Sequence, residues 1–315
     1  MTKAEGRHVP VLLTEALQYL AVRPGAVVVD CTVGLGGHSE AIVRKLGAKG
    51  KLIGFDRDPE ALKLARERLE RVCGELGSEA PAVELIDEAF STAAGHVAAG
   101  SVDGMLADFG VSSLQLDEAA RGFSFSAEGP LDMRMDPRQR LSAAEVVNEA
   151  SERELADLIY FNSEERRARR IARAIVKGRP VITTTQLARI VATAAPTMKG
   201  DRIHPATRTF QGLRIYLNEE LDEIKALLEA APNLLKPSGR FVAISFHSLE
   251  DRLVKDSLRD GARARIWTVM TKKPVTASEE EMTRNPRSRS AKLRAAQRSM
   301  DEGPQARDQR RGIGD

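Results

Sequence analysis

The residues best suited to chemistry in this chain are carboxylates and glycines that follow a short apolar run. The segment VVVDCTVGLGGH, residues 27–38, contains Asp30 and then Gly34, Gly36 and Gly37. Glycines let a ligand approach the backbone closely, and the amino terminus of a following helix offers free N–H groups. The pattern therefore indicates a ligand site, with a tight strand-to-helix connection as the alternative.

A second carboxylate, Asp56, ends the next apolar run, KLIGFD at residues 51–56. In Rossmann-like folds an acid at this point can accept both ribose hydroxyls of an adenosine. A solvent-facing aspartate at a strand end is the alternative for Asp56 taken alone. The two features together favour a cofactor that contains adenosine.

The glycine spacing separates NAD from S-adenosylmethionine, which both carry adenosine. A dinucleotide pyrophosphate needs the pattern G-x-G-x-x-G, and the run G-L-G-G-H lacks the third glycine at that spacing. S-adenosylmethionine has no phosphate, but it has a sulfonium cation and a charged amino-acid end. Acidic strand ends at Asp30 and Asp108 would suit those positive groups, so the sequence favours S-adenosylmethionine.

The elements that must position these residues alternate along the first half of the chain. A helix is expected over residues 39–46, and Asp58, Pro59 and Glu60 provide the cap and first turn of another. Apolar and β-branched runs predict strands at residues 26–30, 51–56, 82–86 and 102–108. This alternation predicts an α/β fold with a parallel sheet and right-handed crossovers.

The middle of the chain differs, because no convincing strand lies between residues 117 and 205. Helices are expected over residues 151–160, 164–177 and 183–194, the first and last with capping boxes. The sheet pattern then returns with a helix at 218–235, a turn at 236–239, a strand at 241–246, a helix at 247–258 and short strands near 264–270 and 290–295. We therefore expect a discontinuous core (1–116 and 206–302), a helical insertion (117–205) that binds substrate, and a disordered tail (303–315).

Composition sets further limits. The chain has 315 residues and a net charge of +3, a mild basic bias that is compatible with nucleic acid without proving it. No apolar run reaches transmembrane length and the first residues lack a signal-peptide pattern, so we expect a cytoplasmic protein with no membrane partner. Two cysteines, Cys31 and Cys73, form no zinc-type motif, so neither a metal site nor a disulfide framework is expected.

Basic residues gather in two segments that could hold RNA phosphates. The first lies on one predicted helix of the insertion, where Glu164 and Glu165 could balance it: Arg166, Arg167, Arg169, Arg170 and Arg173. The second has fewer nearby acids and is favoured for RNA: Arg284, Arg287, Arg289, Lys292, Arg294 and Arg298.

Eight segments, in order, together resemble one family. They are HVPVLLTEAL from His8, DCTVGLGGHSEAI from Asp30, GFDRDPEAL from Gly54, DGMLADFGVSSLQLD from Asp103, RGFSF from Arg121, GPLDMRMD from Gly129, HPATRTFQGLRIYLNEEL from His204 and SFHSLEDRLVK from Ser245. The chain resembles the bacterial small-subunit ribosomal RNA cytosine-N4 methyltransferases, the MraW or RsmH family, from about residue 8 to residue 300.

The resemblance implies a Rossmann-like class I methyltransferase core with an inserted helical domain. It also implies methyl transfer from S-adenosylmethionine to the N4 amine of a cytidine in small-subunit ribosomal RNA. The implied cofactor contacts are Gly36, Gly37, His38, Asp56, Phe90, Asp108 and Gln115. A core aromatic is the alternative for Phe90, and a cap of its own helix is the alternative for His38.

Methyl transfer from a sulfonium is an in-line displacement, so the enzyme must align the amine and exclude water. Many amino-methyltransferases carry a D/N/S-P-P-aromatic motif after the fourth strand, but here residues 108–113 read DFGVSS. Asp108 is the first candidate for orienting the amine or the amino end of the cofactor. Weaker candidates are Ser112 and Ser113, with a loop-structural role as the alternative, and His247, which follows Ser245 and Phe246 and could be a helix cap or a base contact.

Methylation at cytosine C5 would need a cysteine nucleophile. Neither Cys31 nor Cys73 follows the fourth strand, so this chemistry is disfavoured. Two other readings stay open: a methyltransferase that acts on DNA or protein, and a non-catalytic, cofactor-sensing RNA-binding assembly factor. The target nucleotide, the state of the substrate and the oligomeric state are not indicated by the sequence.

Overall fold

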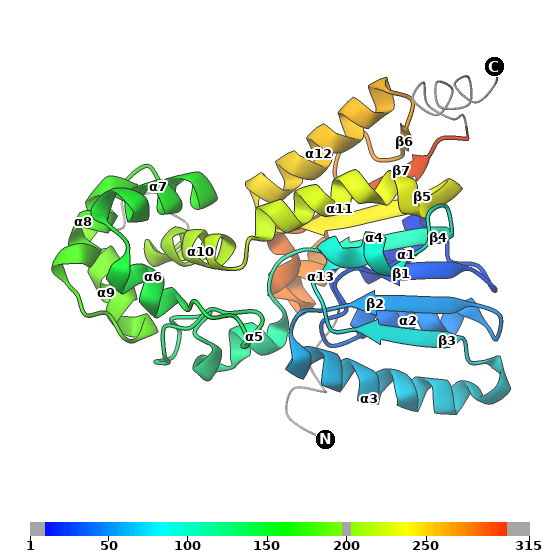
Figure 1. Ribbon diagram of the computed structural model, residues 1–315, viewed down its shortest axis with the longest axis horizontal. Coiled ribbons are helices and arrows are strands. Elements are labelled where there is room, and N and C mark those ends of the chain that lie inside the picture. Colours follow the sequence, from blue (N-terminus) through cyan, green and yellow to red (C-terminus); the bar gives the residue numbers. More distant parts are fainter. Residues whose placement is uncertain (1–9, 197–202, 301–315) are drawn as a thin grey trace, which may run out of the picture. The chain divides into compact units, whose positions relative to one another are not determined.

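The computed structural model describes residues 10–196 and 203–300, and the predicted tail lies outside these residues. The chain divides into two compact units. One contains Met1–Gly110 and Asp222–Asp315, and the other contains Val111–Leu221. Figure 1 shows the first unit as a sheet with helices and the second as a group of helices.

The first unit is built on a seven-stranded sheet with the order β3-β2-β1-β4-β5-β7-β6. Its first five strands are parallel, and β7 runs antiparallel to β5 and β6. The strands are β1 Val27–Asp30, β2 Lys51–Phe55, β3 Ala82–Ile86, β4 Val102–Asp108, β5 Leu235–Ser245, β6 Trp267–Val269 and β7 Lys292–Arg298. This doubly wound arrangement confirms the predicted Rossmann-like α/β core.

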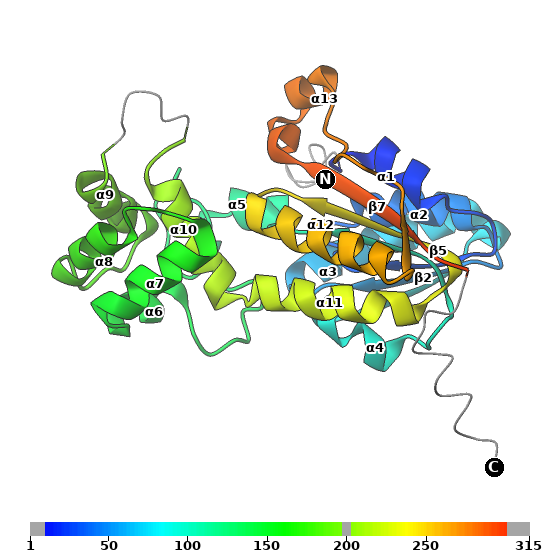
Figure 2. The ribbon, with the colours of Figure 1, turned by 90° about the horizontal axis from the view of Figure 1, so that it is seen from above.

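Helices cover both faces of this sheet because successive strand residues point to opposite sides. Val28, Leu106 and Val242 pack with α1 (Leu13–Leu20), α2 (Gly37–Leu46) and α3 (Pro59–Leu76). Val29, Met105 and Ala243 pack with α4 (Ala93–His96), α11 (Glu220–Leu234) and α12 (Ser248–Arg263). Figure 2 shows α1 and α2 on one side of the sheet and α11 and α12 on the other.

The local start signal of α3 is confirmed. The Asp58 side chain accepts hydrogen bonds from the backbone N–H groups of Glu60 and Ala61, and Pro59 is the first helical residue.

The predicted turn at residues 236–239 is wrong, because β5 already begins at Leu235. The chain keeps pairing with β4 through a register shift, and Ser238 takes a positive φ of 66° there. The strand after α12 is shorter than predicted, and β7 runs on to Arg298.

The second unit contains no named strand among its described residues, in line with the predicted helical insertion. Its helices are α5 Ser113–Asp117, α6 Ala143–Glu149, α7 Glu152–Ser163, α8 Ala168–Lys177, α9 Thr184–Ala194 and α10 Ala206–Leu217. The core side chains include Leu155, Ile171, Val191 and Phe210. This unit extends beyond the predicted residues 117–205, because α10 packs against α7.

Two helix starts in this unit test the sequence patterns. The capping box of Ser151 and Glu154 is confirmed, since each side chain bonds the backbone N–H of the other residue. Helix α8 begins only at Ala168, because Glu164 closes α7 in the left-handed conformation. In the described part of the chain no helix is long and apolar enough to cross a membrane.

Candidate cofactor and active site

Three aspartates mark the carboxyl ends of three neighbouring strands. Asp30 is the last residue of β1, Asp108 is the last residue of β4, and Asp56 directly follows β2. Because β1 lies between β2 and β4 and all three strands are parallel, the aspartates belong to one edge of the sheet. Ligands of open α/β sheets bind at this edge.

Asp30 is fully buried and anchors the segment that follows β1. Its carboxylate accepts a 2.6 Å hydrogen bond from Ser39 Oγ and a 3.1 Å bond from the Thr32 N–H. Burial raises the pKa of Asp30 from 3.8 to about 6, although both hydrogen bonds act in the opposite direction. Asp30 therefore ties the start of α2 to the sheet and adds negative charge beneath the site.

The glycine turn separates into two parts with different functions. Gly36 has a positive φ of 76°, and a Cβ there would lie 3.3 Å from Ala65 Cβ of α3, so this glycine serves the packing of the turn. Gly34 also has a positive φ, and a Cβ there would meet nothing within 4 Å. Gly37 is the first residue of α2 and is buried. Gly34, which was not among the implied contacts, is therefore the glycine most open to a ligand.

Asp56 faces the same turn. Its Oδ2 accepts a 2.7 Å hydrogen bond from the Gly34 N–H, and its Oδ1 accepts a 2.9 Å bond from the Asp58 N–H. Burial raises the pKa of Asp56 to about 6. Each carboxylate oxygen has room for a second donor, so the group can still accept two ribose hydroxyls.

The buried His38 and the partly exposed Asp108 form a pair at the end of β4. His38 Nε2 lies 3.0 Å from the Val11 carbonyl oxygen, so this nitrogen carries the proton and Nδ1 faces Asp108 Oδ2 at 3.7 Å. The alternative role of His38 as a cap of its own helix is wrong, because Gly36 occupies the N-cap and no side chain caps it.

Among the residues of this edge, the Asp108 carboxylate most clearly indicates a ligand-binding site. Burial, together with the charges of Asp30 and Glu250, raises the pKa of Asp108 well above its usual value. Its Oδ1 is buried and accepts no hydrogen bond from the described residues. An unsatisfied buried acceptor is costly, so a donor from a bound molecule fits here.

The end of β5 is held by a hydrogen-bonded cap. Glu250 Oε2 accepts bonds from the N–H groups of Phe246 at 2.7 Å and His247 at 3.2 Å, and His247 Nδ1 accepts from the Glu250 N–H at 3.4 Å. The structure thus gives His247 the helix-cap role that was one of its two alternatives. The Ser245 hydroxyl donates to the Lys292 carbonyl at 3.3 Å. Sequence reasoning missed Glu250, although its spacing from His247 is that of a capping box with histidine in the first place.

Phe90 begins a short 3-10 turn after β3, and its ring centroid lies 5.9 Å from that of Phe109, which follows β4. The two rings offer an apolar wall at the same edge of the sheet.

Glu223 on α11 supports this region, since its Oε2 accepts a 3.2 Å bond from the Ser91 N–H and lies 3.4 Å from the Arg57 guanidinium. Glu223 therefore joins the segments that follow β2 and β3, a role that no local pattern predicts.

Ser112 and Gln115 lie in the helical unit, where they form a capping box at the start of α5. Ser112 Oγ accepts a 3.2 Å bond from the Gln115 N–H, and Gln115 Oε1 accepts a 3.0 Å bond from the Ser112 N–H. The loop-structural alternative for Ser112 is thus realised, and Ser113 is the first residue of α5. A ligand contact of Ser112 or Gln115 stays a prediction.

The cysteines are poorly suited to nucleophilic attack. Cys31 is buried next to Asp30, and burial together with the negative charge of Asp30 raises the pKa of its thiol well above the usual value. Cys73 is partly exposed on α3, and burial raises its pKa as well. Only the thiolate is a strong nucleophile, so these environments agree with a mechanism without a covalent cysteine.

Some residues of the basic stretch near the C-terminus are buried or paired, and others are exposed. Arg294 is only 8% exposed, and its guanidinium bonds Asp251 of α12 at 2.7 and 3.2 Å. Lys292 lies 3.5 Å from the same carboxylate, and Arg298 donates to the Leu235 carbonyl. The expectation that Arg294 meets RNA is therefore wrong, because it holds α12 on the sheet. The exposed members of the stretch are Arg284, Arg287 and Arg289.

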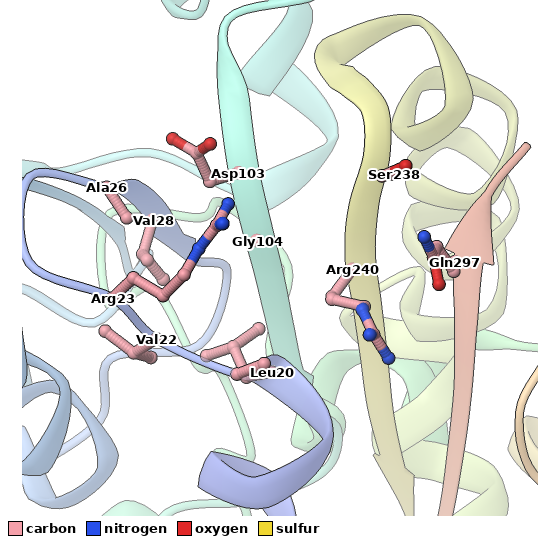
Figure 3. Close-up of a pocket in the computed structure, with 11 residues that line it drawn as sticks. Leu20, Val22, Arg23, Ala26, Val28, Asp103, Gly104, Ser238, Arg240 and Gln297 are labelled. Atoms are coloured by element: carbon pink, nitrogen blue, oxygen red, sulfur yellow. The ribbon is translucent and has the colours of Figure 1, made fainter. Parts of the chain in front are cut away.

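A separate cavity of about 250 Å³ opens near the amino ends of β1 and β4, away from the three aspartates. Figure 3 shows the Arg23 side chain reaching toward the strand that carries Asp103 and Gly104. The Asp103 carboxylate is already engaged, at 2.7 Å from Lys236 Nζ and 2.9 Å from the Val27 N–H. No predicted site residue lines this cavity, so it is distinct from the candidate cofactor site.

The raised pKa of Asp30 predicts a pH-dependent stability. Between pH 3.8 and about 6 the folded protein holds a proton that the unfolded chain has released. The stabilising contribution is therefore full below the unfolded pKa and is lost as the pH rises through the folded one, a total of about 3 kcal/mol. In urea titrations, the free energy of unfolding of the parent should fall by about 2 kcal/mol relative to Asp30→Asn between about pH 4 and pH 8. Parallel pH profiles of the two proteins would contradict this prediction.

Taken together, the doubly wound sheet and the carboxylates around its glycine turn define an α/β enzyme of the class that binds a nucleoside cofactor at strand ends. The MraW methylase family matches residues 5–299, so the chain belongs to that family and is a methyltransferase. It is 64% identical to ribosomal RNA small subunit methyltransferase H of Acidobacterium capsulatum, over 93% of this chain and 98% of that protein. The enzyme of the same name from Koribacter versatilis is 58% identical, over 92% of this chain and 94% of that protein.

Proposed function

We propose that this protein transfers a methyl group from S-adenosylmethionine to the N4 amine of a cytidine in small-subunit ribosomal RNA, and that it acts in the cytoplasm. The observation that carries the proposal is the Asp108 carboxylate, whose buried Oδ1 has no partner among the described residues, beside two further strand-end aspartates. The substrate is supported by the relatives, which bear the name ribosomal RNA small subunit methyltransferase H.

The residues present fit S-adenosylmethionine. Asp56 would accept the two ribose hydroxyls, Gly34 would let the ligand approach the backbone, and Phe90 would lie beside the adenine. The positive amino and sulfonium groups would favour the ionised form of Asp108, whose pKa is raised by burial and by the charges of Asp30 and Glu250. When bound, this cofactor supplies an electrophilic methyl carbon and a neutral thioether leaving group.

The protein must then hold the cytosine amine in line with that carbon. The lone pair of this amine is conjugated with the ring, so an acceptor for its N–H would help to turn the lone pair toward the methyl group. Asp108 would accept from the amine or from the amino end of the cofactor; its Oδ2 lies 3.7 Å from His38 Nδ1, and the charges of Asp30 and Glu250 act on its pKa. The amine proton can leave after transfer, so the reaction needs no strong base.

We propose the helical unit as the substrate domain, with Ser112, the N-cap of α5, and Gln115, within α5, near the point where the chain leaves the cofactor segment. The exposed arginines at positions 284, 287 and 289 remain candidates for phosphate contacts. A basic surface with three exposed guanidinium groups suits RNA without specifying its sequence.

One experiment tests the function directly. The protein is incubated with methyl-labelled S-adenosylmethionine and small subunits from a strain that lacks the enzyme, and the RNA is then digested to nucleosides. We expect label on the N4 amine of a cytidine. Label on DNA, on protein or on cytosine C5 would contradict the proposal. Tight RNA binding without any transfer would instead favour a non-catalytic assembly factor.

A further inference from the structure

Two aromatic side chains are exposed side by side on the helical unit. Tyr160 is 50% exposed and Phe161 is 67% exposed, both on the last turns of α7, and their ring centroids lie 5.4 Å apart. Large aromatic side chains usually contribute to cores or interfaces. Two adjacent rings left in solvent therefore indicate a binding surface rather than a core element.

A basic stripe runs along the neighbouring helix. Arg166, Arg169, Arg170 and Arg173 are spaced by three, one and three residues, which places them on one face of α8 and the turn before it, and all four are exposed. Helices α7 and α8 pack together, and Arg173 Nε lies 3.2 Å from Glu152 Oε1 at the start of α7.

The connection between the helices is short, since α7 ends at Ser163 and α8 begins at Ala168. Arg166 follows Phe161 by five residues and Arg170 follows it by nine, so these arginines lie at the same end of the helix pair as the two rings. We call Tyr160, Phe161, Arg166, Arg169 and Arg170 the aromatic–arginine surface.

The charges of this surface are poorly compensated. Arg166, Arg169 and Arg170 form no ion pair with the described residues, and the helical segment of α8 contains no acid. The nearby Glu165 is buried and pairs with Arg167 at 3.0 Å, so of the two acids before the stripe only Glu164 is exposed beside its four arginines. Unpaired guanidinium groups next to exposed rings suit a polyanion that also offers flat, stackable bases.

We propose that the aromatic–arginine surface binds unpaired nucleotides of the RNA substrate, away from the nucleotide that is methylated. The bases stack on Tyr160 and Phe161, and the phosphates pair with Arg166, Arg169 and Arg170. This inference rests on the proposed RNA substrate. A ribosomal protein could also cover two aromatic rings, but three uncompensated arginines beside the rings favour RNA.

The test uses the full chain and two sets of variants. Tyr160→Ala with Phe161→Ala removes the rings, and Arg169→Gln with Arg170→Gln removes two charges. Tyr216→Ala, which removes an aromatic ring 49% exposed on α10, and Arg189→Gln, which removes an exposed charge on α9, are the matched controls. The probes are an unstructured RNA oligonucleotide of about 12 nucleotides and protein-free small-subunit RNA.

We expect the ring variant to bind the oligonucleotide about 5- to 100-fold more weakly and to show a raised KM for the RNA, because stacking is lost. The charge variant should lower the slope of log affinity against log salt by about 0.7 for each lost phosphate contact. A Tyr160→Trp variant keeps a stacking ring, and its fluorescence should be quenched by the oligonucleotide. Both controls should bind the oligonucleotide as the parent does.

The outcomes separate this inference from the proposed function. If the parent methylates small-subunit RNA but the ring variant binds the oligonucleotide as the parent does, the surface is not an RNA site and the function stands. If the variants lose affinity for assembled subunits alone and not for protein-free RNA, a ribosomal protein covers the surface and the inference is overturned. If the parent transfers no methyl group to RNA, the proposed function fails, whereas quenching of Tyr160→Trp would still report the RNA contact.

Discussion

The Asp108→Ala variant is expected to lose transition-state stabilisation of about 2–5 kcal/mol, which is about 30-fold to several thousandfold in kcat/KM for methyl transfer. The reason is that one buried oxygen of this carboxylate has no partner among the described residues, and in the proposed complex an N–H of the cytosine amine or of the cofactor would donate to it. Steady-state kinetics with small-subunit RNA measure the loss, and calorimetry measures the affinity for S-adenosylmethionine.

The two measurements assign the role of Asp108. An equal loss in cofactor affinity and in kcat/KM means that Asp108 orients the amino end of the cofactor. A loss confined to kcat means that it orients the cytosine amine. Asp108→Asn keeps the size of the side chain, removes its charge and replaces one acceptor oxygen by a donor NH2 group. Asp103→Asn, at the other end of β4, is the control for effects on the strand. Activity at the level of the parent in a folded Asp108→Ala variant would remove this residue from the mechanism.

The second large effect is expected for Asp56. Asp56→Ala should weaken the binding of S-adenosylmethionine by about 1–3 kcal/mol, because charge-assisted hydrogen bonds to the ribose are lost. The carboxylate also accepts from the N–H groups of Gly34 and Asp58, so its loss loosens the glycine turn as well. Calorimetry on the variant and on Glu84→Gln, an exposed carboxylate of the neighbouring strand β3, gives the comparison.

A cofactor analogue distinguishes the direct contact from the loosened turn. An analogue that lacks a ribose hydroxyl should bind the parent more weakly than the natural cofactor does. The Asp56→Ala variant should no longer discriminate between the two, because the acceptor is already gone. If the variant loses affinity but still discriminates as the parent does, Asp56 acts only through the turn.

The order of elements and much of the cofactor edge could be predicted from the sequence because the signals are local. Apolar and β-branched runs placed β3 and β4 at their observed bounds, and Asp58 with Pro59 marked the start of α3. A parallel sheet then brings strand-end acids to one edge by geometry alone, whatever the details of packing. For that reason Asp30, Asp56 and Asp108 could be named before any contact was known.

The function of each side chain at that edge was decided only by the tertiary structure. His38 bonds the carbonyl of Val11, 27 positions away in the chain, and Glu250 affects Asp108 from another element. Arg294, which the sequence grouped with possible RNA-binding residues, is buried against Asp251. The reason is that β7 lies in the interior of the sheet, between β5 and β6. Such contacts depend on strand order and on which face a residue turns to, and no pattern within a few residues encodes them. The sequence by itself therefore determined which residues are available for chemistry, and the packing of distant elements decided which of them are satisfied and which still need a ligand.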